Sequence, residues 1–383
     1  MRSIYLVPGF GGSELRRRDN GAVTWVSYTR LAVGAIGELR LGPDGVSPGP
    51  PDGVQLDAGP PLADYYGSAM SQLAAAMAPY SYVVVPHGYD WRLSCRVTGP
   101  ALAARIRAEV TSADPCTIIG HSMGGLVARL AWADLVRTGD TGLCRRIITI
   151  GAPHWGSYGI VRLWSLDSDV TSQLSLLSTL SIAIYGILVA EANGTYWSQQ
   201  RIAALVSTFP SAYELLPSLL GPDAAADPAR AAIYTGPWPA SRGVSLDRLA
   251  EARDVWQPLL AGASTLPPLS VLTTVGGDGY STVDLLQLPA ILGSPFAYRA
   301  HDSGDGQVTL ASSLLPQSAQ YTLAGAHGDL PIITAGLRQA VAAILDERPP
   351  TPPPPPSNHV LGAWPQVLFG PPIPSTISSS FDP

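Results

Sequence analysis

A serine flanked by glycines stands between two apolar segments in the middle of the sequence. The sequence GHSMG at residues 120–124 follows the short apolar run 116–119 and precedes an apolar pattern with helical spacing. Between a strand and a helix, a G-x-S-x-G sequence exposes the serine hydroxyl at the tip of a strained turn, and a Cβ at either glycine would collide with a neighbouring element. The N–H of Met123, at the start of the helix, is free to bind an anion. The turn could therefore supply a nucleophile, Ser122, and half of an oxyanion hole, although an ordinary glycine-rich turn also fits the pattern.

A serine hydroxyl needs a base to take its proton and a carboxylate to orient that base. Of the six histidines, His327 is the best placed, because it follows a late apolar strand and lies in a glycine-flanked loop. The order Ser, Asp, His along the chain requires an acid between Ser122 and His327. Asp305 and Asp278 both occupy Gly-Asp-Gly turns in that interval, and Asp302 lies close to the first of them. The residues alone leave this choice open.

The segments around these residues alternate between short apolar strands and helices. Strands are predicted at residues 3–7, 82–85, 116–119, 146–150, 269–275 and 320–323, and helices at 65–77, 100–110, 123–137 and 336–346. The strands are continuous apolar runs, which indicates burial on both faces. We therefore predict an α/β fold with a mostly parallel sheet and helices on both faces. Ligands bind at the carboxyl ends of such strands, where the serine turn and the histidine loop both lie.

Two stretches interrupt this alternation. Residues 24–62 form an irregular excursion, and residues 42–61 are so rich in glycine and proline that we expect a loop there. Between residues 158 and 262 no clear strand pattern appears, and short helical stretches predict an inserted helical cap. The core domain then comprises residues 1–157 and 263–347.

The remaining segments bear on partners and location. Residues 348–383 form a proline-rich tail, in which residues 352–356 predict a stiff polyproline segment that could bind a protein partner. The apolar run 180–190 is too short to span a bilayer and is expected in the core of a cap helix. The opening residues have too short an apolar run for a signal peptide. The predicted location is therefore cytoplasmic, unless an export signal was removed.

The bulk composition narrows the function classes. Of the 383 residues, 46% are hydrophobic and only 14% are charged, and the net charge is −6. The high hydrophobic and low charged fractions indicate a large core or a hydrophobic binding surface. The negative net charge excludes nucleic acid as a partner. The three cysteines are odd in number and form no C-x-x-C pair. The sequence therefore suggests neither a disulfide framework nor a thiolate metal site.

Several longer motifs accompany the serine turn. They are VPGFGGSEL at 7–15, YDWR at 89–92, GHSMGG at 120–125, GAPHWGS at 151–157, FPSAYELLPS at 209–218 and SGDGQV at 303–308. With these motifs, residues 3–346 resemble the lecithin:cholesterol acyltransferase-like family (LCAT-like) of α/β-hydrolase lipases and acyltransferases. The combination is far more specific than GHSMGG, which many lipases share. The resemblance implies an α/β-hydrolase fold and a serine-based acyl chemistry that needs no metal and no cofactor.

The resemblance also assigns roles to particular residues. Ser122 would be the nucleophile, His327 the base and Asp305 the acid. The oxyanion would be held by the backbone N–H groups of Phe10, in the first glycine-rich loop, and of Met123. These assignments form a Ser-Asp-His triad with an oxyanion hole.

Other residues near the strand ends receive supporting roles. Substrate contacts are expected in the loops at the carboxyl ends of the strands, from Gly11, Trp91, His154 and Trp155. Asp278 would serve structure by the same resemblance, and His121 would point away from the serine hydroxyl and pack. Asp90 and Arg92 are expected to hold their loop by a buried ion pair.

The sequence therefore predicts a carboxylic-ester hydrolase (lipase, phospholipase or esterase) or O-acyltransferase that acts on a hydrophobic, lipid-like ester. The acyl group would be carried on Ser122, and a transient contact with a membrane or lipid surface would fit such a substrate. Two alternatives stay open. One is the same chemistry on a small apolar metabolite such as a macrolactone. The other is a non-catalytic binding protein that works through its proline-rich tail.

Overall fold

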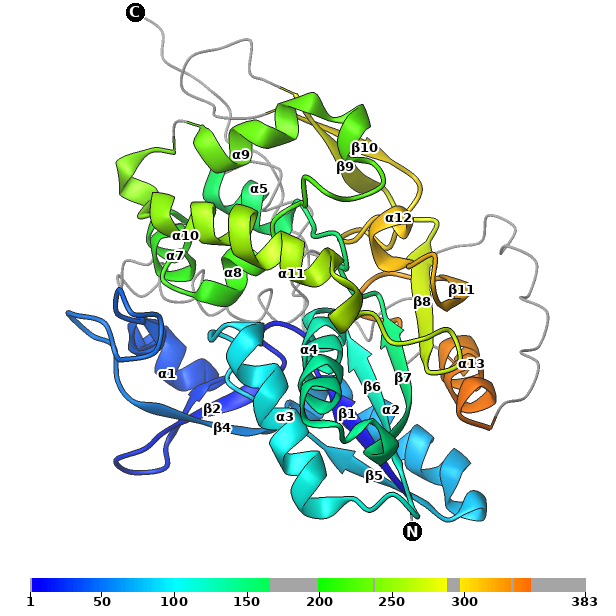
Figure 1. Ribbon diagram of the computed structural model, residues 1–383. Coiled ribbons are helices and arrows are strands. Elements are labelled where there is room, and N and C mark those ends of the chain that lie inside the picture. Colours follow the sequence, from blue (N-terminus) through cyan, green and yellow to red (C-terminus); the bar gives the residue numbers. More distant parts are fainter. Residues whose placement is uncertain (1, 166–198, 237, 288–296, 332–333, 346–383) are drawn as a thin grey trace, which may run out of the picture. The chain divides into compact units, whose positions relative to one another are not determined.

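The central element of the fold is a parallel sheet (Figure 1). The computed structural model describes residues 2–165, 199–236, 238–287, 297–331 and 334–345, and in this part of the chain the sheet has six strands. In order across the sheet they are β11 (Ala319–Ala324), β8 (Leu272–Asp278), β7 (Cys144–Ile150), β6 (Cys116–His121), β1 (Arg2–Val7) and β5 (Tyr82–Pro86). Every neighbouring pair is parallel. These are the strands that the sequence predicts, and the predicted α/β class is confirmed.

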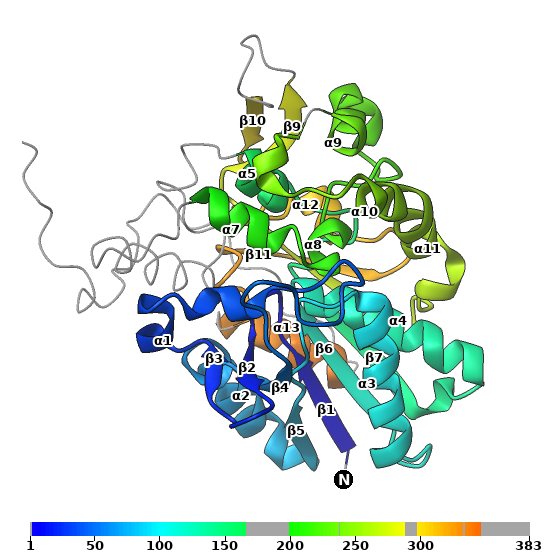
Figure 2. The ribbon, with the colours of Figure 1, turned by 90° about the vertical axis from the view of Figure 1, so that its left-hand side faces the viewer.

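Helices cover both faces of this sheet, as strands buried on two sides require. β1 shows the alternation, because Tyr5 packs in one hydrophobic cluster and Ile4 packs in another. The first cluster includes side chains of α3 (Cys95–Glu109) and α4 (Met123–Thr138), and the second includes side chains of α2 (Ala63–Met77) and α13 (Thr334–Leu345). Figure 2 shows α3 and α4 on one side of the sheet and α2 on the other.

The strand order brings two glycine-rich loops together. β5 lies on one side of β1 and β6 on the other, so the direction of chain progression reverses at β1. Val7, the last residue of β1, pairs with Gly120 of β6. The loop that follows β1 and the turn that carries Ser122 therefore begin at adjoining positions, where open parallel sheets bind their ligands.

Residues 24–62 contain more regular structure than the sequence predicts. β2 (Ser13–Arg17) pairs antiparallel with β3 (Val23–Trp25) and with β4 (Leu56–Pro61), and α1 (Tyr28–Ala32) and the 3₁₀ helix η1 (Ala35–Leu39) stand between β3 and β4. The prediction of a loop throughout residues 42–61 is therefore wrong. In the order β3-β2-β4 the proline-rich β4 lies at an edge, where a missing proline N–H breaks no ladder bond.

A second small sheet lies in a segment where the sequence predicts no strand. β9 (Thr282–Gln287) and β10 (Ala297–His301) form an antiparallel pair between β8 and β11, and the short helix α12 (Leu310–Ser313) follows them. A hairpin whose two strands are separated by a long connection carries no turn signal that the sequence could reveal.

Helix α3 begins earlier than its proline suggests. The sequence predicts a helix over 100–110 with Pro100 in its first turn, but α3 starts at Cys95 and contains Pro100 in its interior. The side chain of Ser94 accepts the N–H of Arg96 at the N-terminus of the helix. The carboxylate of Glu214 accepts the N–H of Cys95 at 2.7 Å. These caps satisfy N–H groups that a helix end leaves free, and the second comes from a distant part of the chain.

A layer of helices lies between β7 and β8 in the chain. It comprises α5 (Gly159–Ser165), α7 (Gln199–Val206), α8 (Pro210–Glu214), α9 (Ala232–Thr235), α10 (Leu246–Glu251) and α11 (Gln257–Ala261), which we call the cap helices. None of the described residues between 158 and 262 forms a strand. Figure 1 shows the cap helices beyond the carboxyl ends of the strands. The apolar run 180–190 and the proline-rich tail lie outside the described residues.

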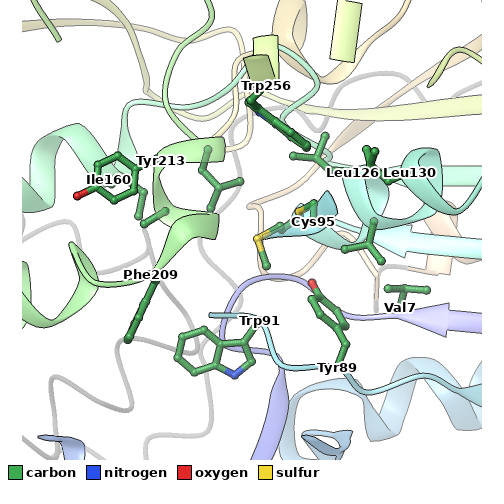
Figure 3. Packing of buried hydrophobic residues seen from close by; sticks show 14 of the residues in the cluster. Val7, Tyr89, Trp91, Cys95, Leu126, Leu130, Ile160, Phe209, Tyr213 and Trp256 are labelled. Atoms are coloured by element: carbon green, nitrogen blue, oxygen red, sulfur yellow. The ribbon is translucent and has the colours of Figure 1, made fainter. Parts of the chain in front are cut away.

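Aromatic side chains join the cap helices to the loops of the core. Phe209, at the start of α8, packs against Trp91 with ring centroids 5.6 Å apart (Figure 3). Ser211 donates a hydrogen bond from its hydroxyl to the carbonyl of Trp91 at 2.7 Å. The loop after β5 is thus held from the cap side by both packing and hydrogen bonding. No helix in the described parts of the chain is long and apolar enough to cross a membrane.

Candidate active site

Ser122 occupies a strained turn between β6 and α4. Its backbone has φ 53° and ψ −129°, a region that residues other than glycine rarely adopt. The turn is held on each side by close packing, because a Cβ on Gly120 would lie 2.5 Å from the carbonyl oxygen of Gly124, and one on Gly124 would lie 2.3 Å from that of Val7. The collisions predicted for side chains at both glycines are therefore present in the structure.

Three side chains from distant parts of the chain form a continuous hydrogen-bonded row. His327, in the loop after β11, places Nε2 2.9 Å from Oγ of Ser122 and Nδ1 2.7 Å from Oδ2 of Asp305. The Asp305 carboxylate can only accept, so Nδ1 carries the proton and donates to it. Nε2 is then free to accept the hydroxyl hydrogen of Ser122. This is the arrangement that activates a serine.

The structure distinguishes the three candidate acids. Asp305 is 1% exposed, and its Oδ1 accepts the N–H groups of Gln307 at 3.0 Å and Val308 at 2.7 Å, so its second oxygen is aimed at the imidazole. Asp278 ends β8, and its buried Oδ1 has no hydrogen-bond partner among the described residues. Asp302 is exposed. Of the three aspartates, the structure places Asp305 against His327.

The loop after β1 passes directly beside the serine. A Cβ on Gly9 would lie 2.8 Å from Cβ and 3.3 Å from Oγ of Ser122, so only glycine fits there. Within the described residues, the backbone N–H groups of Phe10 and Met123 have no hydrogen-bond partner. The Phe10 ring packs against Trp91 with ring centroids 4.9 Å apart. Two free donors thus flank the serine, and the side chain of one of them anchors the loop.

The four residues predicted to contact substrate have different surroundings. Trp91 is 1% exposed, and its indole N–H donates to the carbonyl of Ser13 at 3.1 Å. His154 is also 1% exposed, and its Nε2 lies 3.0 Å from Oγ1 of Thr149. Both side chains are therefore buried and hydrogen-bonded to neighbouring residues, and their contact with substrate stays a prediction. They follow strands as predicted, but packing against neighbouring elements turns their rings inward.

Gly11 and Trp155 lie in the predicted loops, and their contact with substrate stays a prediction. Gly11 is buried and accepts the indole N–H of Trp25 at 2.6 Å. Trp155 lines a narrow cavity of about 10 Å³ together with Tyr158 and Arg230, too small for an acyl chain. A larger cavity of about 390 Å³ lies in the cap segment, lined by Leu219, Leu220, Gly221, Ala224, Ala225, Asp227, Pro228 and Ala231. Ser122, Asp305 and His327 are not among its lining residues.

Two buried residues support the site, and the sequence predicted the packing of only one of them. His121 was expected to pack, and it does so at 4% exposure, with Nε2 3.0 Å from the carbonyl oxygen of His327. Tyr66 of α2 was not singled out, yet its hydroxyl lies 2.8 Å from Nδ1 of His121. A pair of adjacent tyrosines, Tyr65 and Tyr66, at the start of a helix was the signal available. The predicted buried ion pair of Asp90 and Arg92 is present at 2.6 Å.

Burial shapes the electrostatics around Ser122, Asp305 and His327. It lowers the pKa of His121 well below the ordinary value of 6.5, and the nearby His327 lowers it further. It also lowers the pKa of His154 well below 6.5, with the Arg129 guanidinium as a second cause. Both supporting histidines are therefore neutral near pH 7. Within the described residues, no group of three or more His, Cys, Asp or Glu side chains could hold a metal ion.

Comparisons with known proteins agree with this architecture at the level of the fold. Similar solved structures include the Tle4–Tli4 complex, with a TM-score of 0.51, 10% sequence identity and coverage of 90% of this chain and 98% of that chain. They also include the mature lipase BlEst2 of Bacillus licheniformis, with a TM-score of 0.39 at 13% identity, covering 90% of this chain and 91% of that one. YbtT, a type II thioesterase from the yersiniabactin biosynthetic pathway, has a TM-score of 0.34 at 15% identity and coverage of 90% and 92%. No family model and no curated protein sequence matches the chain.

The fold itself follows from the features already described. The α/β-hydrolase architecture combines a parallel sheet with a serine turn between a strand and a helix. It also has the chain order serine, acid, histidine, which here is Ser122, Asp305, His327. The similarity to the Tle4–Tli4 complex extends over nearly the whole chain and agrees with it. The chain therefore has the α/β-hydrolase fold.

Proposed function

We propose that this protein is a serine hydrolase of carboxylic esters that forms an acyl-enzyme on Ser122. The observation that carries the proposal is the row of three side chains, in which Nε2 of His327 lies 2.9 Å from the serine Oγ and Nδ1 lies 2.7 Å from Asp305. A serine in such a row can lose its proton as it attacks. The strained turn and the two free N–H groups beside it support the same chemistry.

The reaction would proceed in two halves, and in each half one proton passes from the attacking hydroxyl to His327 and then to the leaving group. As Ser122 attacks the ester carbonyl, Nε2 of His327 takes the hydroxyl proton and Asp305 stabilises the imidazolium. The N–H groups of Phe10 and Met123 hold the negative oxygen of the tetrahedral intermediate. The intermediate expels the alcohol, which takes the proton from His327. In the second half, water or another alcohol attacks the acyl-enzyme by the same route and releases the acyl product.

A hydrophobic acyl group is the substrate class that best fits the chain. The sequence motifs resemble those of LCAT-like lipases and acyltransferases, and the rings of Trp91 and Phe209 pack against the ring of Phe10. A series of p-nitrophenyl esters of increasing acyl length tests this part of the proposal. We expect kcat/KM to rise from acetate to the medium-chain esters. A fall over that range would assign the site to short acyl groups instead.

The first prediction concerns the nucleophile itself. Wild-type protein should react covalently with a fluorophosphonate probe, whereas Ser122→Ala should show no labelling, because the probe bonds to an activated serine oxygen. Labelling is measured by mass on the intact, folded protein, with Ser71→Ala on the exposed side of α2 as the matched control. Equal labelling of wild type and Ser122→Ala would show that Ser122 is not the nucleophile.

A second measurement separates hydrolysis from acyl transfer. Incubation of an ester with and without an alcohol acceptor, followed by product identification by mass, reports which molecule resolves the acyl-enzyme. We expect the free acid as the main product in water. If a new ester predominates when the alcohol is added, the protein is an acyltransferase that uses the same serine.

A further inference from the structure

The hydroxyl of Tyr66 lies where three loops of the candidate active site meet. Tyr66 belongs to α2, which covers the opposite face of the sheet from the helix that follows the serine, and it is 1% exposed. Its oxygen accepts the N–H of Gly9 at 2.8 Å and lies 2.8 Å from Nδ1 of His121. The other ring nitrogen of His121, Nε2, lies 3.0 Å from the carbonyl oxygen of His327. Four residues from four segments thus form one buried chain of hydrogen bonds.

The direction of each hydrogen bond in this series can be assigned, because the carbonyl oxygen at one end can only accept. The carbonyl oxygen of His327 can only accept, so Nε2 of His121 carries a hydrogen and donates it. Because a buried neutral imidazole has one N–H, Nδ1 of His121 must accept, and the hydroxyl of Tyr66 donates to it. The Tyr66 oxygen is then left to accept the N–H of Gly9. Each donor has one acceptor, and no member of the chain is left unsatisfied.

Each end of this series of hydrogen bonds adjoins a residue with a proposed role in the reaction. Gly9 directly precedes Phe10, whose N–H is a proposed oxyanion donor. Tyr66 holds the N–H of Gly9, and the Gly9 carbonyl, which shares a peptide plane with the Phe10 N–H, accepts the N–H of Gly12 at 3.0 Å. At the other end, His327 is the proposed base, and its carbonyl is held by the residue that precedes Ser122. A second tyrosine of α2 reinforces this end, because Tyr65 donates from its hydroxyl to the carbonyl of Gly328 at 2.8 Å.

We propose that Tyr66 and His121 are positioning residues that hold the oxyanion loop and the histidine loop in register with Ser122. The inference rests on the proposed serine chemistry. Neither residue touches the serine oxygen, so neither takes part in proton transfer. Their effect is to keep the Phe10 N–H and the His327 imidazole at the places where charge develops in the transition state. A preorganised donor of this kind stabilises the transition state more than the bound substrate.

Tyr66→Phe is the variant that isolates this role. It keeps the ring, which packs edge-on against Tyr65 with ring centroids 4.8 Å apart, and it removes only the oxygen. The N–H of Gly9 and Nδ1 of His121 then lose their common partner. We expect kcat for a p-nitrophenyl ester to fall about 10- to 100-fold, below the loss of a complete oxyanion donor, while KM stays within about twofold.

Tyr213→Phe provides the matched control. Tyr213 is also buried, and its hydroxyl likewise accepts a backbone N–H, that of Ser245 at 2.9 Å, and donates to the carbonyl of Ser207 at 2.9 Å. It lies in the cap segment and contacts no triad residue. Tyr213→Phe should lose a similar amount of thermal stability to Tyr66→Phe and should keep wild-type kcat. The comparison separates the cost of deleting a buried hydroxyl from the cost of misplacing the site.

The inhibition constant of a transition-state mimic is a measurement that a loss of stability alone would not change. An alkyl boronic acid forms a tetrahedral adduct with the active serine, so its inhibition constant should rise in Tyr66→Phe by the same factor by which kcat/KM falls. In a double-mutant cycle, His121→Gln alone and His121→Gln with Tyr66→Phe should be about equally slow, because either change breaks the same chain. Rates of wild type and of the variants that keep Ser122 are expressed per serine titrated by the fluorophosphonate, which excludes unfolded protein.

The outcomes separate this inference from the proposed function. If wild type turns over esters, Ser122→Ala does not, and Tyr66→Phe matches Tyr213→Phe in kcat and in boronate binding, the positioning role is wrong and Tyr66 only packs. Additive losses in the double-mutant cycle would equally overturn the coupling of Tyr66 to His121. If Ser122→Ala retains wild-type activity, the proposed function fails first, and the inference fails with it.

Discussion

At the residue scale, the acid is decided by what each carboxylate contacts. Asp305 uses one oxygen for the N–H groups of Gln307 and Val308 and the other for His327. An amide in its place cannot satisfy both sides, because its NH₂ must face either the two N–H donors or the imidazole N–H. Asp278, by contrast, has a buried oxygen with no partner in the described part of the chain, so an amide there removes no hydrogen bond to that oxygen.

We therefore expect Asp305→Asn to lower kcat about 1,000-fold or more, because His327 then takes the wrong tautomer. Asp278→Asn is the matched control and should stay within about threefold of wild type. Ester turnover per titrated serine measures both variants. If Asp278→Asn were the inactive one and Asp305→Asn nearly normal, the acid would be Asp278, and the contact with His327 would serve structure alone.

Sequence reasoning reached the residues of the row but not all of those that support it. Ser122 and His327 could be predicted because a short motif and the order of segments mark them locally. Tyr66 could not, since a tyrosine on a helix gains its role only when that helix packs beside the strand ends. Trp91 and His154 were predicted as substrate contacts because they follow strands. A strand end fixes where a residue lies but not which way its ring turns.

At the element scale, the junction of α8 with α3 depends on one buried carboxylate. Glu214 ends α8, and its side chain accepts hydrogen bonds from the hydroxyl of Ser94 and the N–H of Cys95 at the N-terminus of α3. Two effects oppose each other there. Burial favours the neutral acid, whereas the donors and the helix terminus favour the carboxylate. Burial is the larger effect and raises the pKa of Glu214 from 4.5 to about 7.

This shift predicts a definite pH dependence of stability. A carboxyl whose pKa is raised on folding contributes stability that is complete below pH 4.5 and is lost as the pH rises towards 7. Glu214→Gln keeps a neutral hydrogen-bonding side chain and should lack that loss. The free energy of unfolding of the variant relative to wild type should therefore increase between pH 4.5 and 7, by at most about 3 kcal/mol.

Denaturant unfolding at several pH values between 4.5 and 8 measures the effect. Glu251→Gln serves as the control, because Glu251 forms an exposed ion pair with Arg96 and its side chain is 58% accessible. The control should show a change below about 0.5 kcal/mol over the same range. A relative stability of Glu214→Gln that falls with rising pH would mean that the donors at α3 outweigh burial, and that Glu214 acts as an ionised cap.

At the element scale, too, the sequence predicts what is marked locally and misses what depends on contacts between distant parts of the chain. The six strands of the parallel sheet could be predicted because continuous apolar runs mark strands buried on both faces. The start of α3 could not, because one of its caps comes from Glu214, far along the chain. The edge strand β4 was taken for a loop, since its prolines and glycine are compatible with a strand only where one side is unpaired.

At the scale of the whole described unit, core and cap share one hydrophobic cluster. Val7 and Leu126 of the core belong to the same cluster as Phe209 and Trp256 of the cap segment (Figure 3). The composition of the two parts does not reveal this shared packing, because apolar content alone does not say which residues meet. The continuity implies that the cap helices and the adjoining face of the sheet lose their structure together.

A buried cation completes the attachment of the cap segment. Arg129 of α4 is 1% exposed and donates to the carbonyl oxygens of Leu260 and Thr265, where the cap segment returns to the core. A further guanidinium nitrogen lies 3.3 Å from Nδ1 of His154. Burial lowers the pKa of Arg129 to about 9, so the group still carries its charge at pH 7. Its acceptors are two backbone carbonyl oxygens, the hydroxyl oxygen of Thr265 and one imidazole nitrogen.

The last prediction follows from weighing these terms in Arg129→Met. The variant no longer pays for burying a charge, but it leaves up to four buried acceptors short of a donor, at about 1 to 3 kcal/mol each. We expect a net loss of about 2 kcal/mol in the free energy of unfolding, in a single urea transition. Arg137→Met on the same helix, where the side chain is 71% accessible and paired with Asp134, should lose less than about 1 kcal/mol. If Arg129→Met were as stable as wild type, the cost of burying the charge would equal the value of its hydrogen bonds, and the attachment of the cap segment would rest on apolar packing alone.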